Sequence, residues 1–153
     1  MADTDLNAGA LTVTITEALS VGHDVTTDGR DFAQVCTHTF TGILNTSKRI
    51  IKLVDTALIK VATFGTDTDD GAFVRGDVRY IRVTNLDGTA TLQVGLDDEA
   101  SDAAYTELAP ATSIMYTAVK CEGNNGGTTL HDAASLKVKG VADHQLEVFI
   151  ASV

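Results

Sequence analysis

The stretch RYIRVTNLDGTATLQVGL, residues 79–96, carries the clearest structural signal in the chain. Two runs of alternating apolar and polar residues flank Asp87 and Gly88, a pair typical of two-residue hairpin turns. Such a turn would pair Leu86 with Thr89, Val83 with Leu92, and Ile81 with Val94. The apolar pairs then share one face, as a correct register requires. The stretch therefore predicts a β-hairpin with one buried face.

The C-terminal stretches SLKVKGV and HQLEVFIASV predict a second hairpin. A loop with an even number of residues would set Val138 opposite Glu147, which places a charge against the core. A three-residue loop over residues 142–144 instead pairs Val138 with Val148 and Leu136 with Ile150. Because this register keeps the apolar pairs together, we expect the odd loop.

Other short runs have the same strand character. LTVTITEAL and QVCTHTFTGI alternate with period two, and TSIMYTAV predicts a further strand. RIIKLV and ALIKVATF fit either strands buried on both faces or one interrupted helix. We favour strands, because each run is short and rich in β-branched residues. Residues 65–77, 97–110 and 122–132 are predicted to be loops, the second with one helical turn.

About nine short strands and little helix predict an all-β fold, either an antiparallel β-sandwich or a jelly-roll-like barrel. Thr and Val are plentiful, which favours β-structure. The length of 153 residues fits a single domain over residues 1–153, with residues 1–10 as an N-terminal arm.

The charge of the chain narrows the classes of partner. A formal net charge of −10 argues against binding of nucleic acid and against docking on anionic lipid.

The first residues lack the basic and apolar segments of a signal peptide, and there is no apolar run long enough to span a membrane. We therefore expect Cys36 and Cys121 to be reduced, buried thiols, with a disulfide as the alternative.

Candidate sites for chemistry are few. Cys36 and His38 would share a strand face, but a zinc site needs two further ligands at a suitable spacing. His23, His131 and His144 each adjoin an Asp, without the sequence context of an activated nucleophile. The sequence thus predicts no catalytic residue, no cofactor and no enzyme.

The acidic stretch DTDDG, residues 67–71, resembles a calcium-binding loop in composition only. Counted from Asp67, the sixth position of an EF-hand loop is Ala72 and the twelfth is Val78, where Gly and Glu are needed. An irregular calcium site built from Asp67, Asp69 and Asp70 remains as an alternative to a solvated loop.

Aromatic residues provide little for recognition of sugars. Carbohydrate-binding modules present aromatic platforms, but this chain has no Trp, and its aromatic share is 5%. Tyr80, Tyr105 and Tyr116 could form such a platform, although packing in a core or interface explains them more simply.

The blocks RIIKLVDTALIKVATF, VRYIRVTNLDGTATLQVGL, ELAPATSIMY, SLKVKGV and HQLEVFIASV resemble small β-rich virion structural proteins of tailed bacteriophages, of the kind found in marine and cyanobacterial phages. The shared pattern is a Y-I-R-V-T-N-L-D strand, a partner strand, an L-x-P turn and a final strand with an apolar end. The resemblance covers roughly residues 48–153. It offers no binding residues that could be transferred position by position.

This resemblance implies a non-enzymatic virion component that is assembled in the host cytoplasm. A capsid decoration (cement) protein is the preferred hypothesis, with the major capsid protein or other virion proteins as partners and a homo-oligomer, preferably a trimer, as the assembly. The alternatives are a neck, tail or fibre-associated component and, after those, a carbohydrate-binding β-sandwich module.

Overall fold

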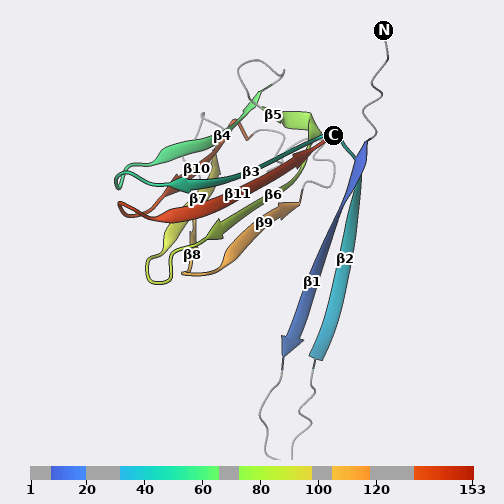
Figure 1. Cartoon of the computed structure of the whole chain (residues 1–153), viewed down its shortest axis with the longest axis horizontal. Helices are drawn as coiled ribbons and strands as arrows, with labels where there is room; N and C mark the ends of the chain where they lie inside the picture. Colours follow the sequence, from blue (N-terminus) through green and yellow to red (C-terminus); the bar gives the residue numbers. More distant parts are fainter. Residues whose placement is uncertain (1–7, 20–31, 66–72, 98–104, 118–132) are drawn as a thin grey trace, which may run out of the picture. The chain divides into compact units, whose positions relative to one another are not determined.

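The computed structural model describes residues 8–19, 32–65, 73–97, 105–117 and 133–153, which form eleven strands and one short 3₁₀ helix (Figure 1). The predicted all-β fold is confirmed. The chain divides into two compact units, Met1–Ile43 and Leu44–Val153. The sequence predicts one sandwich over residues 1–153, whereas every described strand of the sandwich lies in the second unit. We describe each unit by itself.

The first unit contains a two-stranded antiparallel sheet, which we call the ribbon. Its strands are β1 (Gly9–Leu19) and β2 (Phe32–Ile43), both of which the alternating pattern predicts. The register shifts by one residue between Gly9 and Ala10, close to Gly42, whose φ of 74° lies in the left-handed region. Glycine adopts that conformation without a steric penalty, so it suits the irregular end of the ribbon.

The second unit is a sandwich of two sheets. The four-stranded sheet has the order β3 (Asn45–Lys52), β11 (Gln145–Ser152), β6 (Val78–Asn85) and β9 (Ser113–Thr117). The five-stranded sheet has the order β5 (Phe73–Val74), β4 (Ile59–Gly65), β10 (Ser135–Lys139), β7 (Leu92–Asp97) and β8 (Tyr105–Leu108). The 3₁₀ helix η2 (Arg75–Asp77) links β5 to β6. Every pair is antiparallel except β4 with β5.

The path of the chain through these sheets is that of a jelly roll. The connections from β3 to β4, β6 to β7, β8 to β9 and β10 to β11 each cross from one sheet to the other. The strands β7 and β8, which follow each other in sequence, pair within one sheet. This interleaving places sequence neighbours on opposite sides of a common core, which is the arrangement of a double-sheet jelly roll.

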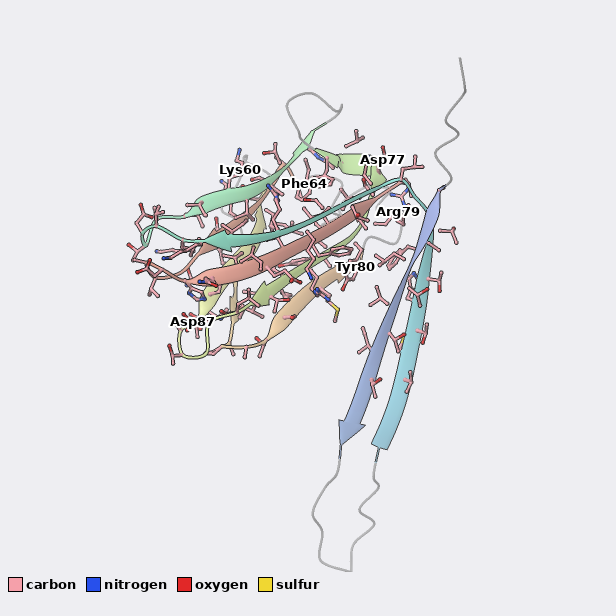
Figure 2. All side chains as sticks on the ribbon, in the orientation of Figure 1. Lys60, Phe64, Asp77, Arg79, Tyr80 and Asp87 are labelled. Atoms are coloured by element: carbon pink, nitrogen blue, oxygen red, sulfur yellow. The ribbon has the colours of Figure 1, made fainter. Side chains whose placement is uncertain are left out.

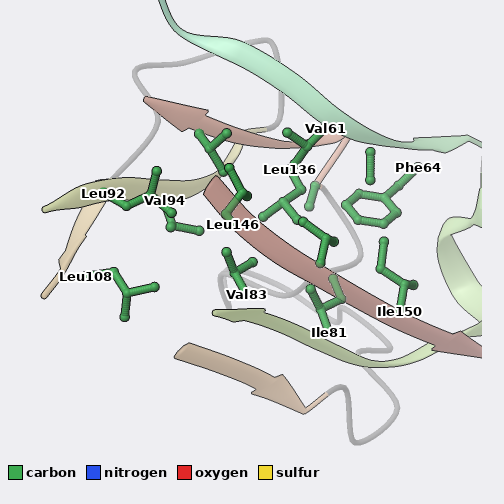
Figure 3. Packing of buried hydrophobic residues seen from close by; sticks show 14 of the residues in the cluster. Val61, Phe64, Ile81, Val83, Leu92, Val94, Leu108, Leu136, Leu146 and Ile150 are labelled. Carbon is green, nitrogen blue, oxygen red and sulfur yellow. The ribbon is translucent and has the colours of Figure 1, made fainter. Parts of the chain in front are cut away.

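The core lies between the two sheets and consists of aliphatic side chains and one Phe (Figure 3). Residues from the four-stranded sheet meet residues from the five-stranded sheet across it: Ile81, Val83, Leu146, Val148 and Ile150 on one side, and Val61, Phe64, Leu92, Val94, Leu136 and Val138 on the other. Each fully buried side chain of this size contributes about 1.5–3 kcal/mol relative to exposure. The alternating strands therefore supply the main stabilisation of the sandwich.

The predicted hairpin over residues 79–96 is wrong. β6 pairs with β11 and β9, whereas β7 pairs with β10 and β8, so Val83 and Leu92 lie in opposite sheets on either side of the core. A two-residue hairpin turn of this type needs positive φ at both central residues, and neither Asp87 nor Gly88 has one. The segment 86–91 instead arches over the end of the sandwich.

The second predicted hairpin fails for the same reason. β10 belongs to the five-stranded sheet and β11 to the four-stranded sheet, so Val138 does not pair with Val148. The connection is an arch in which Asp143 has a φ of 67°, a left-handed conformation that Asp tolerates better than most residues. Both sets of apolar residues are buried, as predicted, but by opposing sheets.

Three smaller predictions also need correction. β3 is an edge strand with mostly exposed side chains, so it is not buried on both faces. The predicted loop 97–110 contains β8, and residues 73–77 of the predicted loop 65–77 form β5 and η2. The predicted loop 122–132 lies outside the described residues.

Candidate interaction surfaces

The structure does not describe the residues that the sequence proposes as calcium ligands. Asp67, Asp69 and Asp70 lie outside the described residues. Within the described ranges, no group of three or more His, Cys, Asp or Glu side chains is placed to hold a metal ion.

Cys36 and His38 share a face of β2, as the alternation predicts, but Cys36 is exposed. The predicted buried thiol at this position is therefore wrong, because the ribbon has only two strands and offers little cover. His38 packs its ring against Phe40, with ring centroids 4.4 Å apart. Cys121 lies outside the described residues, as do His23 and His131.

His144 is fully buried and belongs to the architecture of the sandwich. Its Nε2 lies 2.6 Å from Oδ1 of Asn85, which is also fully buried. The amide nitrogen of Asn85 donates to the carbonyl oxygens of Ala90, Leu108 and Ala109, which fixes the orientation of the amide. Oδ1 must then accept, so Nε2 of His144 carries the proton.

This pair, which we call the Asn85–His144 clasp, ties together four connecting loops. Asn85 reaches the loops that follow β6 and β8, and His144 belongs to the loop that precedes β11. The fourth loop joins through Leu53, whose N–H donates to the carbonyl of His144 at 2.8 Å. Buried polar groups that are hydrogen-bonded in this way fix one arrangement of the loops, because leaving one of them unpaired is costly.

The three tyrosines do not form one platform. Tyr80, at the start of β6, is only 3% exposed, and its burial raises the pKa of its hydroxyl despite the nearby Arg82 (Figure 2). Tyr116 is half-buried against the core, and burial raises its pKa as well. Tyr105 is exposed on β8, in the other sheet. Tyr80 is thus inaccessible to a sugar ring.

The outer face of the four-stranded sheet carries a row of large side chains that crosses all four strands. Lys48, Phe149, Arg82 and Met115 lie directly opposite one another from β3 to β9. Directly opposite residues point to the same face of a sheet. In the next row, Ile50 lies opposite Glu147. We call this set of residues the β11 face: Lys48, Ile50, Arg82, Met115, Glu147 and Phe149.

Charge and apolar surface alternate on the β11 face. Glu147 accepts from Lys48 at 3.1 Å and from Arg82 at 2.5 Å, and these two contacts lower the pKa of its carboxyl group. The guanidinium of Arg82 lies 5.9 Å from the centre of the Phe149 ring. Around this cluster, Ile50 and Met115 are 66% and 39% exposed. Two cations and one anion give this face a positive balance in an acidic chain.

The ribbon presents two contrasting faces. Leu11, Val13 and Ile15 of β1 are half-buried and pair with Phe40, His38 and Cys36 of β2. The opposite face consists mainly of exposed threonines, with the hydroxyls of Thr12 and Thr39 3.4 Å apart. A two-stranded sheet is marginally stable by itself in water, so this element is suited to gain stability from a further contact.

Sequence reasoning missed both the clasp and the β11 face. A signal for the clasp existed in Asn85, a polar residue at an apolar position of the alternation, but its partners are distant in sequence.

None of the described helices is long and apolar enough to cross a membrane. No protein-family model, no curated protein and no solved structure matches this chain.

Proposed function

We propose that the protein is a non-enzymatic structural component of a tailed-phage particle, most simply a capsid decoration protein that braces the head through protein–protein contacts. The resemblance of residues 48–153 to small phage virion proteins is the origin of this proposal. Jelly rolls occur in viral capsid proteins but also in lectins and cupins, so the fold supports the proposal only by analogy.

The observation that carries the proposal is the β11 face. Aromatic residues, Met and Arg are enriched in the centres of protein interfaces, and Phe149, Met115 and Arg82 form one continuous row here. The row crosses a sheet that the core holds rigid from below, so little conformational freedom is lost when it binds. Its positive balance suits an acidic site on the shell.

Binding to empty capsid shells of the phage that encodes the chain tests the proposal. We expect saturable binding in many copies per shell and a higher temperature of shell disruption. A double variant, Ile50→Asp with Met115→Asp, should lose most of this binding, because it places carboxylates on two exposed positions of the β11 face.

Val54→Asp is the matched control, since Val54 is an exposed apolar residue just beyond β3 and outside the β11 face. It should bind shells like the unmodified chain. Absence of shell binding by the unmodified chain would contradict the proposal. A low copy number in intact particles, counted by quantitative mass spectrometry, would point instead to a neck, tail or fibre position.

A further inference from the structure

The ribbon exposes sheet edges in a way that the sandwich does not. Within the described residues, β1 pairs only with β2, so the other edge of each strand has no partner strand. An unpaired edge offers a row of N–H and C=O groups to another chain, and proteins normally block such edges with charges, short strands or irregularities.

The edges of the sandwich follow that rule. β3 carries Lys48, Arg49 and Lys52, while β5, β8 and β9 are only two, four and five residues long. β1, in contrast, is eleven residues long and contains no Pro and no charged residue before Glu17. β2 is twelve residues long and contains no Asp, Glu, Lys or Arg, so both long edges of the ribbon are exceptions in a chain with a net charge of −10.

The sequence of β1 also matches itself when reversed. In an antiparallel pair of two β1 strands centred on Val13, each Leu11 faces Ile15 of the second copy. Each Thr12 faces Thr14 of the second copy, and the single charge, Glu17, faces Gly9. Apolar residues thus meet apolar residues on one face, threonines meet threonines on the other, and no like charges oppose each other. β2 matches itself less well. Reversal about Thr37 sets Cys36 against His38 and Val35 against Thr39, and reversal about His38 sets the two His38 side chains against each other.

We propose that the outer edge of β1 is an interface with a second copy of this chain, in which two ribbons join about a twofold axis into a four-stranded sheet of order β2–β1–β1–β2. Such a contact uses the same surface on both copies and closes on itself, so it produces a dimer. It differs from the trimer that the resemblance to phage virion proteins favours. The inference does not depend on a role in a phage particle.

Charges placed on the threonine face test both the contact and its register. Thr12 and Thr14 are exposed and lie on the face opposite Val13. One variant carries Thr12→Lys with Thr14→Lys, and the other carries Thr12→Glu with Thr14→Glu. In the proposed register each variant sets two pairs of like charges against each other across the copies. Mixing the variants instead sets each lysine against a glutamate.

The measurement is the mass of the full chain by sedimentation equilibrium at low ionic strength, where charge effects are least screened. The unmodified chain should reach twice its 16.1 kDa mass as concentration rises. Each variant alone should dimerise about tenfold more weakly or worse, and the equimolar mixture should recover the dimer. The mixture also controls for damage that the substitutions cause within a chain. Every chain in it carries one of the two pairs of substitutions, so recovery of the dimer shows that the variant chains still fold.

Three results would overturn the inference. The unmodified chain could stay a monomer, or it could form a trimer. The mixture could also be no more dimeric than its components, as expected if the ribbons met through Leu11, Val13 and Ile15 instead. None of these three results depends on whether the β11-face variant binds shells, so each of the two proposals can fail without the other.

Discussion

The carboxylate of Glu147 lies between Lys48 and Arg82, and these contacts hold its pKa below the ordinary value. A carboxyl group with a lowered pKa in the folded state stabilises the fold above its unfolded pKa, and this contribution is lost as the pH falls through the folded pKa. We therefore expect Glu147→Gln to lower the free energy of unfolding at pH 7 and to have a smaller effect near pH 3. Urea unfolding at a series of pH values measures this difference.

Glu107→Gln on β8 is the control for this prediction, since it removes the same charge from an exposed position in the other sheet. Its effect on unfolding should not shrink in the same way as the pH falls. An equal effect of Glu147→Gln at both pH values would show that the two cations do not stabilise the ionised carboxylate.

At the residue scale, alternation predicted which side chains share a face but not how well each face is covered. Cys36 and His38 share a face as expected, yet Cys36 is exposed, because a sheet of only two strands covers little of its own surface. The sequence, in contrast, places His144 in a loop beside Asp143, yet its side chain is fully buried. Its burial depends on Asn85, which is distant in sequence and therefore invisible to local pattern.

Among the elements, the strands were largely predictable and their pairing was not. Apolar alternation places Val83 and Leu92 in a core whether the two strands pair side by side or face each other across two sheets. Contacts made by the connection between β6 and β7 decide which of these two arrangements forms. Asp87 accepts hydrogen bonds from the backbone of Thr89 and Ala90, and Asn85 binds carbonyls of a separate loop. These bonds shape an arch, so the local signal for a turn led to the wrong connection.

The arch between β10 and β11 has no free space at Gly140. A Cβ built there would lie 2.7 Å from Nδ1 of His144 and 2.8 Å from Cδ1 of Leu53. Both of these side chains are buried, and the clasp holds His144 in place, so neither can move aside cheaply. We expect Gly140→Ala to lower the free energy of unfolding by about 1–3 kcal/mol, measured by urea denaturation.

Gly88→Ala is the matched substitution in the arch between β6 and β7. A Cβ there would meet nothing within 4 Å, and the φ of Gly88 is not positive. Its stability should stay unchanged or rise by up to about 1 kcal/mol, because Ala reduces the freedom of the unfolded chain. Similar losses from the two substitutions would mean that the loops pack less tightly around His144 than the structure describes.

In the whole molecule, the jelly-roll path explains why one buried pair can organise so much of the sandwich. Four of the connections that cross between the sheets, those after β3, β6, β8 and β10, gather at one end. Backbone bonds there join Leu53 to His144, Leu86 to Gln145 and Ala111 to Asp87. The clasp lies among them and links the two sheets by polar contacts, while the aliphatic core links them along their length. The sandwich thus offers a stiff support for the β11 face.

The two units should differ in how their protection from amide exchange depends on protein concentration. β6 and β11 have partner strands on both sides within one chain, so their amides should exchange slowly at every concentration. β1 has a partner strand on one side only, and its outward-facing amides gain partners when the proposed dimer forms. Hydrogen exchange with mass spectrometry should therefore show slower exchange in β1 as concentration rises, with β6 unchanged. A dimer that left exchange in β1 unchanged would place its interface on another surface of the chain.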